Sequence, residues 1–168
     1  MESVYVVCIK RMESKPTRSR AYKKMNTKKI GNIGEAKTLA KFVELGIPVY
    51  IPFGDNESAD LIVEFNGKLN KIQCKTTDKV KDGIIIWNIK SVVVTGGTKW
   101  KTHKYTEDEV DYFSLYCKEL DLLLLVPIQA ISARTALSFT YPYREVKSAH
   151  SQRNFEDFLF EKIIWRVM

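Results

Sequence analysis

Four polar side chains, far apart in the sequence, have the residue types needed to cleave a phosphodiester with the help of a metal. Glu35 lies within an expected helix, Asp60 opens an expected strand, and Gln73 and Lys75 lie close together on the next expected strand. Hard oxygen ligands suit Mg²⁺, and an ammonium group polarises water or stabilises charge on a phosphate. We therefore expect these residues to hold a divalent metal and an attacking water against a phosphodiester.

The expected roles differ among these residues. Asp60 is the best metal ligand, Gln73 offers a neutral amide oxygen, and the backbone carbonyl of Cys74 completes the coordination while its thiol packs in the core. Lys75 polarises the water or stabilises the phosphate, and Glu35 binds a second metal or orients the water. Simpler interpretations remain open at this point: a turn-forming aspartate, a polar residue on a half-exposed strand, a lysine without function and an ordinary surface charge on a helix.

The helix that carries Glu35 has clear end signals. Thr27 can cap its start, Gly46 supplies a left-handed stop after about Leu45, and Pro48 prevents continuation. Helical spacing predicts a sheet-facing stripe with Glu35 at its edge. The stripe consists of Ile33, Ala36, Ala40 and Val43.

Strand patterns surround the remaining chemical residues. Alternation along 68–75 places Gln73 and Lys75 on the same face, and Asn66-Gly67 is a strong hairpin signal before it. Thr106 and Glu109 form a candidate capping box. The other expected elements are strands at 3–9, 48–53, 60–65, 84–94, 112–117, 122–128 and 137–140, and a final helix from Asn154.

Charge and cysteine usage restrict the partners and the compartment. The 168 residues carry a formal net charge of +7, which favours a polyanionic partner. Three widely spaced cysteines suit a reducing cytoplasm, and no stretch is long and apolar enough to span a membrane. The basic segment from Lys10 to Lys29 is either a solvated leader or an arm that lies along phosphates.

Basic and aromatic residues outside the four-residue set are candidates for DNA contact. We expect phosphate contacts from Lys23, Lys24, Lys28, Lys29, Lys79 and Lys81. Base edges are within the expected reach of Lys99, Lys101, Lys104 and Arg144. Trp100 and Tyr105 are either apolar or stacking neighbours of these residues, or serve in core packing or an oligomer contact.

Other chemistries lack necessary parts. His103 and His150 have no neighbouring cysteine or histidine at zinc-ligand spacing, and no serine-nucleophile elbow occurs. Asp55 and Glu57 are expected to be solvated loop residues.

The same motifs resemble the PD-(D/E)XK nuclease superfamily, and more closely its branch encoded within bacterial group I introns as homing endonucleases. The matching segments are G-N-I-G-E-A-K (31–37), V-Y-I-P-F-G-D-N (49–56), Ala59-Asp60, Gln73-Cys74-Lys75 and the hairpin pattern at 111–128. Two positions depart from the superfamily signature: Ala59 replaces a proline, and Gln73 replaces an acidic residue, although the intron-encoded branch is similar in carrying glutamine there.

The resemblance implies an α/β fold with a restriction-endonuclease-like core, in which a central mixed β-sheet is flanked by helices and extended by β-hairpins. A length of 168 residues fits one nuclease domain, which we divide into a basic N-terminal strand or arm (1–29), a catalytic core (30–130) and a C-terminal extension (131–168). The basic segment and the tail after Ser132 do not carry the resemblance, and their roles rest on composition. By this resemblance the catalytic residues would be Glu35, Asp60, Gln73 and Lys75. The cofactor would be Mg²⁺, and Mn²⁺ would be able to substitute for it. The active form on double-stranded DNA would be a homo-oligomer, either a dimer or a tetramer. The expected activity is sequence-specific double-strand cleavage; a Holliday-junction resolvase or a decayed DNA-binding module are the alternatives.

Overall fold

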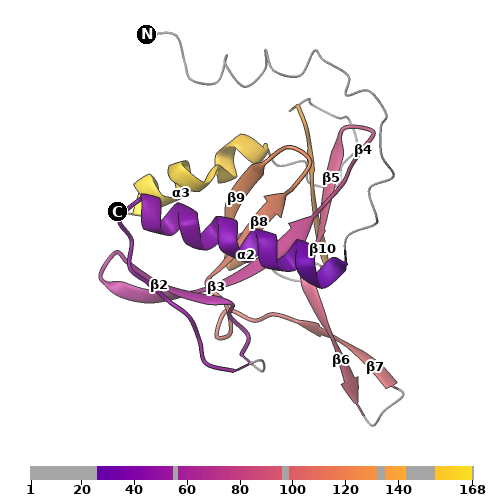
Figure 1. Ribbon diagram of the computed structural model, residues 1–168, viewed down its shortest axis with the longest axis horizontal. Helices are drawn as coiled ribbons and strands as arrows, with labels where there is room; N and C mark the ends of the chain where they lie inside the picture. The colour runs from indigo at the N-terminus through magenta and orange to yellow at the C-terminus, as the bar shows by residue number, and fades with distance from the viewer. Residues whose placement is uncertain (1–25, 55–56, 96–98, 132–134, 143–153, 168) are drawn as a thin grey trace.

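A five-stranded mixed sheet forms the centre of the protein. The computed structural model describes residues 26–54, 57–95, 99–131, 135–142 and 154–167, without the side chains of 93–95 and 99–100. The sheet order is β1-β2-β3-β8-β9 (Figure 1). These strands are Val49–Tyr50, Leu61–Phe65, Lys68–Thr77, Tyr112–Cys117 and Leu122–Pro127. Only the β3–β8 pair is parallel among them.

Two hairpins with short turns set the register of this sheet. Asn66 and Gly67, with φ of 54° and 70°, join β2 to β3, as the Asn-Gly signal predicts. The predicted turn at Lys118 to Asp121 joins β8 to β9. Alternate residues of β9 enter different hydrophobic cores, Leu124 in one and Leu125 in the other, so both faces of the sheet are covered.

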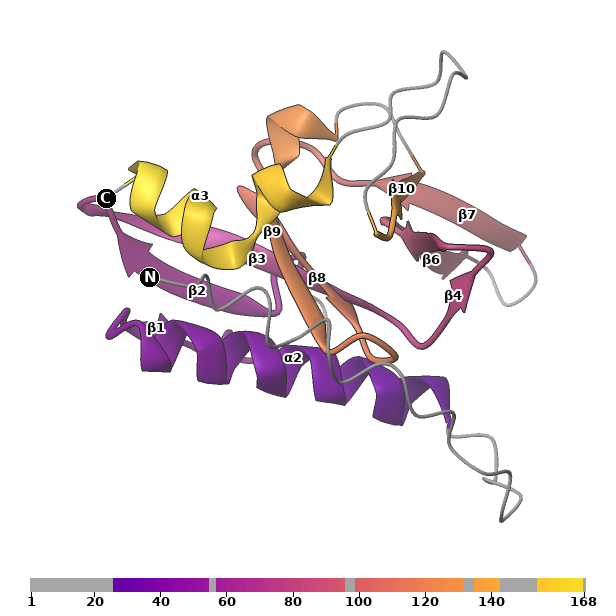
Figure 2. The ribbon, with the colours of Figure 1, turned by 90° about the horizontal axis from the view of Figure 1, so that it is seen from above.

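Helices cover one of these faces. Helix α2 (Thr27–Glu44) and helix α3 (Phe160–Val167) meet through Phe42 and Phe160, whose ring centroids are 4.7 Å apart. Both helices contribute to the core that contains Leu125. Figure 2 shows α2 running along the sheet. Short 3₁₀ turns occupy Ile128–Ala130 and Phe155–Phe158, and Asn154 caps the second of them, close to the predicted start of the last helix.

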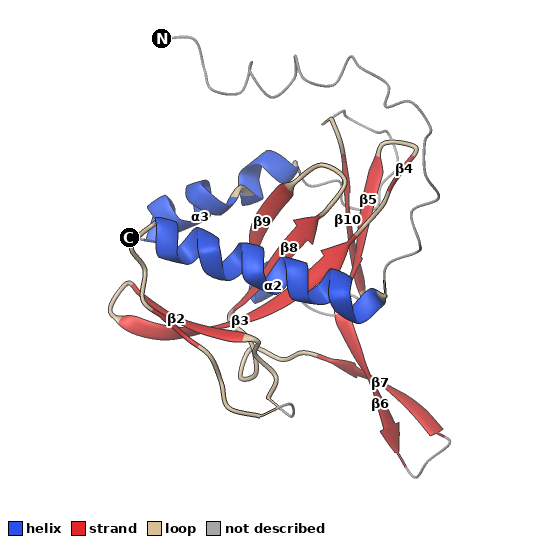
Figure 3. Ribbon diagram, in the orientation of Figure 1, coloured by secondary structure: helices blue, strands red, loops and turns tan. Residues whose placement is uncertain are grey.

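Smaller sheets extend the protein beyond the main sheet (Figure 3). Strands β4 (Val80–Lys81), β5 (Ile84–Asn88) and β10 (Ala136–Thr140) form one of them and contribute Trp87 and Phe139 to the other core. Strands β6 (Lys90–Thr95) and β7 (Lys99–Lys104) form a two-stranded ribbon that projects from the body in Figure 1.

The expectation of one strand over 84–94 was therefore wrong. The chain leaves the β4–β5–β10 sheet after Asn88, and Ile89 is buried with its N–H bonded to the Thr135 carbonyl at 3.1 Å. The next residues pair with β7 instead. The strand expected at 48–53 is also shorter, and the strand expected at 3–9 lies outside the described residues.

The predicted contact face of α2 was wrong as well. Val43 is 58% exposed, and the other members of the predicted stripe, Ile33, Ala36 and Ala40, are exposed or only partly buried. The buried positions are Ile30, Gly34, Thr38 and Phe42. Their spacing of four residues defines a single face, but two of them are small or polar, so hydrophobicity did not mark it. The helix cap is Asn26, one residue before the predicted Thr27.

Taken together, the mixed sheet, its flanking helices and the added hairpins give the predicted α/β architecture.

Candidate active site

The centre of the candidate site is an open edge of β3. Pairing with β2 ends at Leu61 and Ile72, whereas β3 continues to Thr77. Asp60 immediately precedes β2, and its N–H donates to the Ile72 carbonyl at 2.9 Å. The Asp60 carboxylate then takes the position of the missing strand partner, because Oδ2 accepts the backbone N–H of Cys74 at 2.7 Å. This contact fixes the carboxylate at the sheet edge.

Gln73 is bonded to the same carboxylate oxygen. Its Nε2 lies 2.5 Å from Asp60 Oδ2 and 3.4 Å from the Cys74 carbonyl oxygen. The side chain is buried, so the alternative of a polar residue on a half-exposed strand was wrong. The amide nitrogen therefore lies between the two oxygens, of Asp60 and of the Cys74 carbonyl, that the sequence predicts as metal ligands.

Close packing of α2 on β3 brings Glu35 to this edge. A Cβ added at Gly34 would lie 1.9 Å from Thr76 Oγ1, so only glycine permits the observed approach. One turn further along, the Thr38 hydroxyl is 2.7 Å from the Ser114 hydroxyl of β8 and donates to the Gly34 carbonyl. Sequence reasoning missed both positions, because Gly34 is only one of two glycines in the helix, Gly31 has no atom within 4 Å of an added Cβ, and a threonine within a helix is not distinctive.

The two carboxylates influence each other. Burial raises the pKa of Asp60, against the lowering effects of the Cys74 N–H, the Lys75 ammonium and the Gln73 amide. The pKa of Glu35 is also raised, first by burial and then by the negative charge of Asp60, while Lys75 lowers it. Burial likewise raises the pKa of the Cys74 thiol, which packs in the core as predicted and is not a ready nucleophile.

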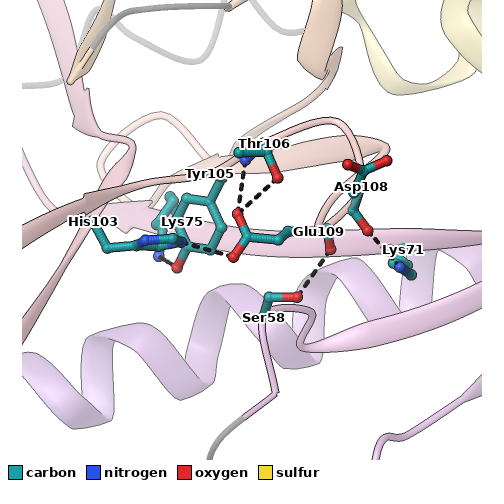
Figure 4. A network of polar contacts seen from close by, with 8 residues as sticks. All are labelled: Ser58, Lys71, Lys75, His103, Tyr105, Thr106, Asp108 and Glu109. Atoms are coloured by element: carbon teal, nitrogen blue, oxygen red, sulfur yellow. Dashed lines mark hydrogen bonds and ion pairs between the residues drawn. The ribbon is translucent and has the colours of Figure 1, made fainter.

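Lys75 points toward an aromatic residue that the sequence did not connect with it. Its Nζ donates to the Tyr105 hydroxyl at 3.2 Å and lies 5.0 Å from the ring centroid (Figure 4). Tyr105 follows β7 and packs on Phe113 with ring centroids 5.4 Å apart. The ammonium thus lies on the same side of β3 as the core that contains Phe113.

A family comparison decides how this geometry is to be interpreted. The model of the PD-(D/E)XK endonuclease family matches residues 25–160. The chain belongs to the PD-(D/E)XK endonucleases. All four predicted catalytic residues lie within the matched range.

A solved structure has a similar fold to this PD-(D/E)XK endonuclease. The structure of a bacterial homing endonuclease, I-Ssp6803I, aligns with a TM-score of 0.66 and 20% sequence identity. The alignment covers 84% of this chain and 95% of that chain. At this identity the likeness shows a shared restriction-endonuclease-like fold. A search of curated proteins finds no match.

The basic residues predicted to contact DNA lie on several elements of this PD-(D/E)XK endonuclease. Six are exposed: Lys28, Lys29, Lys79, Lys81, Lys101 and Lys104. Lys99 and Trp100 belong to β7, but only their backbone is described, and Lys23, Lys24 and Arg144 lie outside the described residues.

The remaining predicted features give a mixed outcome. Glu57 is exposed, as expected, while Asp55 and His150 lie outside the described residues. The Thr106–Glu109 contact forms, with Glu109 Oε2 accepting the Thr106 N–H at 2.8 Å, but it closes a turn and starts no helix. Within the described ranges, no helix is long and apolar enough to cross a membrane.

Proposed function

We propose that this PD-(D/E)XK endonuclease is a Mg²⁺-dependent, sequence-specific double-strand DNA endonuclease of the homing type. The observation that carries the proposal is the arrangement of Glu35, Asp60, Gln73 and Lys75 around the open edge of β3. Helix α2, the residue before β2 and strand β3 supply these groups from distant parts of the sequence.

The donor atoms at this edge suit a hard divalent cation. In the part of the chain that is described, no three His, Cys, Asp or Glu side chains converge on one point. An ion held here would therefore rely on neutral oxygens as well, namely the Cys74 carbonyl and the side-chain amide oxygen of Gln73. The Gln73 amide would have to be turned over, so that Oε1 takes the place of Nε2 next to the Asp60 carboxylate. The negative charge of Asp60 raises the pKa of Glu35, and this unfavourable contact supports the proposal, because a bound cation would relieve it.

Each side chain then has a defined task. When bound, Mg²⁺ supplies Lewis-acid polarisation of the phosphate and of a water. Asp60, Gln73 and the Cys74 carbonyl would hold the ion, and Glu35 would orient the attacking water or hold a second ion. Lys75 places a positive charge where negative charge develops on the phosphate, and because it is partly buried, solvent screens that charge less.

DNA binding is assigned to the exposed lysines and to the β6–β7 ribbon. A two-stranded ribbon fits the major groove of B-DNA. Strand alternation puts Lys101 on the ribbon face that also carries His103, which contacts Tyr105 beside Lys75. This face would approach bases while the nuclease centre reaches the backbone.

A homo-oligomer is proposed as the active form. One centre of this kind cleaves one strand, so cutting both strands of a duplex calls for two copies related by symmetry. A dimer or a tetramer meets this requirement. Sedimentation of the protein with and without duplex DNA distinguishes these states from a monomer.

A cleavage screen tests the proposed activity. Purified protein is incubated at low salt with a library of long duplexes and Mg²⁺ or Mn²⁺, and new ends are mapped by sequencing. We expect cuts in both strands at a defined sequence, none with a chelator, and none with Lys75→Ala although that variant still binds DNA. Wild-type protein that leaves every duplex intact would contradict the proposal.

Two other outcomes point to the alternatives. Cutting that depends on a four-way junction and not on sequence would indicate a resolvase. If Lys75→Ala leaves every measurable property unchanged, the protein is a DNA-binding module whose nuclease centre has decayed. The reason to consider this alternative is that Gln73 is uncharged where the superfamily signature has an acidic residue.

A further inference from the structure

We propose that Tyr105 is a positioning residue for Lys75, and that His103 and Glu109 hold Tyr105 in place. This inference deepens the proposed function and rests on it. The direct observation is the 3.2 Å hydrogen bond from Lys75 Nζ to the Tyr105 hydroxyl, with the ammonium also 5.0 Å from the ring centroid.

Lysine needs such a partner to act as a fixed charge. Its four-carbon chain is flexible, and an ammonium that samples several rotamers is seldom at the reacting phosphate. A hydroxyl acceptor and an aromatic face together restrict Lys75 before DNA arrives. Preorganised charge costs no reorganisation during the reaction, which is why its position matters for the rate.

The Tyr105 ring is itself held on two sides. It meets Phe113 and His103 in edge-to-face contacts, with ring centroids 5.4 Å and 5.5 Å away. Phe113 is buried in the core. His103 Nε2 in turn lies 2.9 Å from Glu109 Oε1, so the imidazole is fixed at its far end (Figure 4).

Glu109 connects this group to the rest of the site. Its other oxygen, Oε2, accepts the N–H and the hydroxyl of Thr106 at 2.8 and 3.0 Å. Its backbone carbonyl accepts a hydrogen bond from the hydroxyl of Ser58 at 3.0 Å. Ser58 lies two residues before Asp60 in the sequence. Because Tyr105 follows β7 directly, the residue that holds Lys75 also links the nuclease centre to the ribbon.

Tyr105→Phe is the central variant for the test, since it removes the hydroxyl and keeps the ring. Its matched control is Tyr116→Phe: Tyr116 has Lys37 Nζ of α2 5.8 Å from its ring centroid and donates to Asp121. The Tyr116 ring therefore lies on the α2 side of the sheet, opposite the side on which Lys75 meets Tyr105. Single-turnover cleavage and DNA affinity are measured separately for each variant. The order of the Lys75 ammonium is followed by ¹⁵Nζ relaxation.

We expect Tyr105→Phe to cleave on the order of 10- to 100-fold more slowly with DNA affinity unchanged, and to loosen the Lys75 ammonium. The cleavage rate and the ammonium order of Glu109→Gln should be intermediate between those of Tyr105→Phe and wild type. Tyr116→Phe should match wild type in cleavage rate and in ammonium order. A Tyr105→Phe protein with wild-type cleavage and wild-type ammonium order overturns the inference, whatever its melting temperature.

The failure of the inference and that of the proposed function are distinguishable. If Lys75→Ala abolishes cleavage while Tyr105→Phe leaves it unchanged, the positioning role alone is wrong. If Lys75→Ala cleaves normally, the function proposed for the centre is wrong.

Discussion

Replacing Gly34 by alanine should displace Glu35 without touching any polar group of the centre. The added Cβ would lie 1.9 Å from Thr76 Oγ1, about 1.5 Å short of the 3.4 Å at which ordinary contact begins, and the neighbouring Thr76 Cβ is only 3.2 Å away. Overpacking of this kind typically costs about 1–3 kcal/mol, whereas alanine gains about 1 kcal/mol over glycine inside a helix. We therefore expect a net loss of up to about 2 kcal/mol in the free energy of unfolding.

The effect on cleavage should exceed the effect on stability. A shift of α2 by about 1 Å moves Glu35, the next residue, and displacements of that size can lower rates by about 100-fold. Denaturant unfolding and single-turnover cleavage measure the two quantities.

Two further variants make this prediction specific. Gly31→Ala lies on the same helix with no atom within 4 Å of the added Cβ, so it should be slightly stabilising and fully active. Thr76→Ala removes a buried hydroxyl that has no hydrogen-bond partner among the described residues, and in combination with Gly34→Ala it should restore most of the activity. If Gly34→Ala behaves like Gly31→Ala in both assays, the close approach does not position the helix.

Three other predictions concern charge. Because burial raises the pKa of Asp60, its ionised form destabilises the folded state at any pH above the pKa of the unfolded carboxyl. Asp60→Asn should therefore unfold at a higher denaturant concentration than wild type at pH 7, lose that advantage in acid, and have no cleavage activity. A lower denaturant midpoint for Asp60→Asn at pH 7 would contradict burial as the cause of the shift. The pKa of Glu35 is raised too in the metal-free protein. An NMR titration of its carboxyl without divalent ions should therefore give a midpoint above the value near 4 typical of exposed carboxyls, added Mg²⁺ should lower that midpoint, and an unraised metal-free midpoint would disagree. Lys79→Ala and Lys81→Ala remove exposed lysines predicted to contact phosphates. Each should weaken DNA binding and lower the salt slope of the logarithm of affinity by about 1, measured by titration at several salt concentrations, and an unchanged slope would remove these lysines from the interface.

Local signals were sufficient to predict most of the main sheet. Asn66-Gly67 adopts the two left-handed conformations that a two-residue hairpin requires, and this fixes the register of β2 on β3. Strand alternation then places Gln73 and Lys75 on one side of β3, away from Cys74 in the helix-facing core. The residue types and positions of Glu35 and Asp60 indicated these two as well, and the resemblance to a nuclease family grouped all four residues as one catalytic set.

The sequence was less informative wherever packing distance, and not hydrophobicity, determines the structure. The buried face of α2 includes Gly34 because the helix approaches β3 closely, and Thr38 because Ser114 satisfies its hydroxyl. The break at Ile89 follows Asn88, a residue common in turns, but that single residue within a long β-branched run did not outweigh the strand pattern. The contact between Lys75 and Tyr105 joins residues thirty positions apart on different elements, which no local pattern encodes.

The most direct measurement of the central claim is the position of a bound divalent cation. Crystals grown with duplex DNA and Mn²⁺ give an anomalous signal that locates the ion without reference to activity. We predict a peak at the Asp60 carboxylate and the Cys74 carbonyl, with the Gln73 amide turned to present Oε1, and no peak in Asp60→Asn. A Mn²⁺ peak elsewhere on the chain, or an equal peak in Asp60→Asn, would contradict the account.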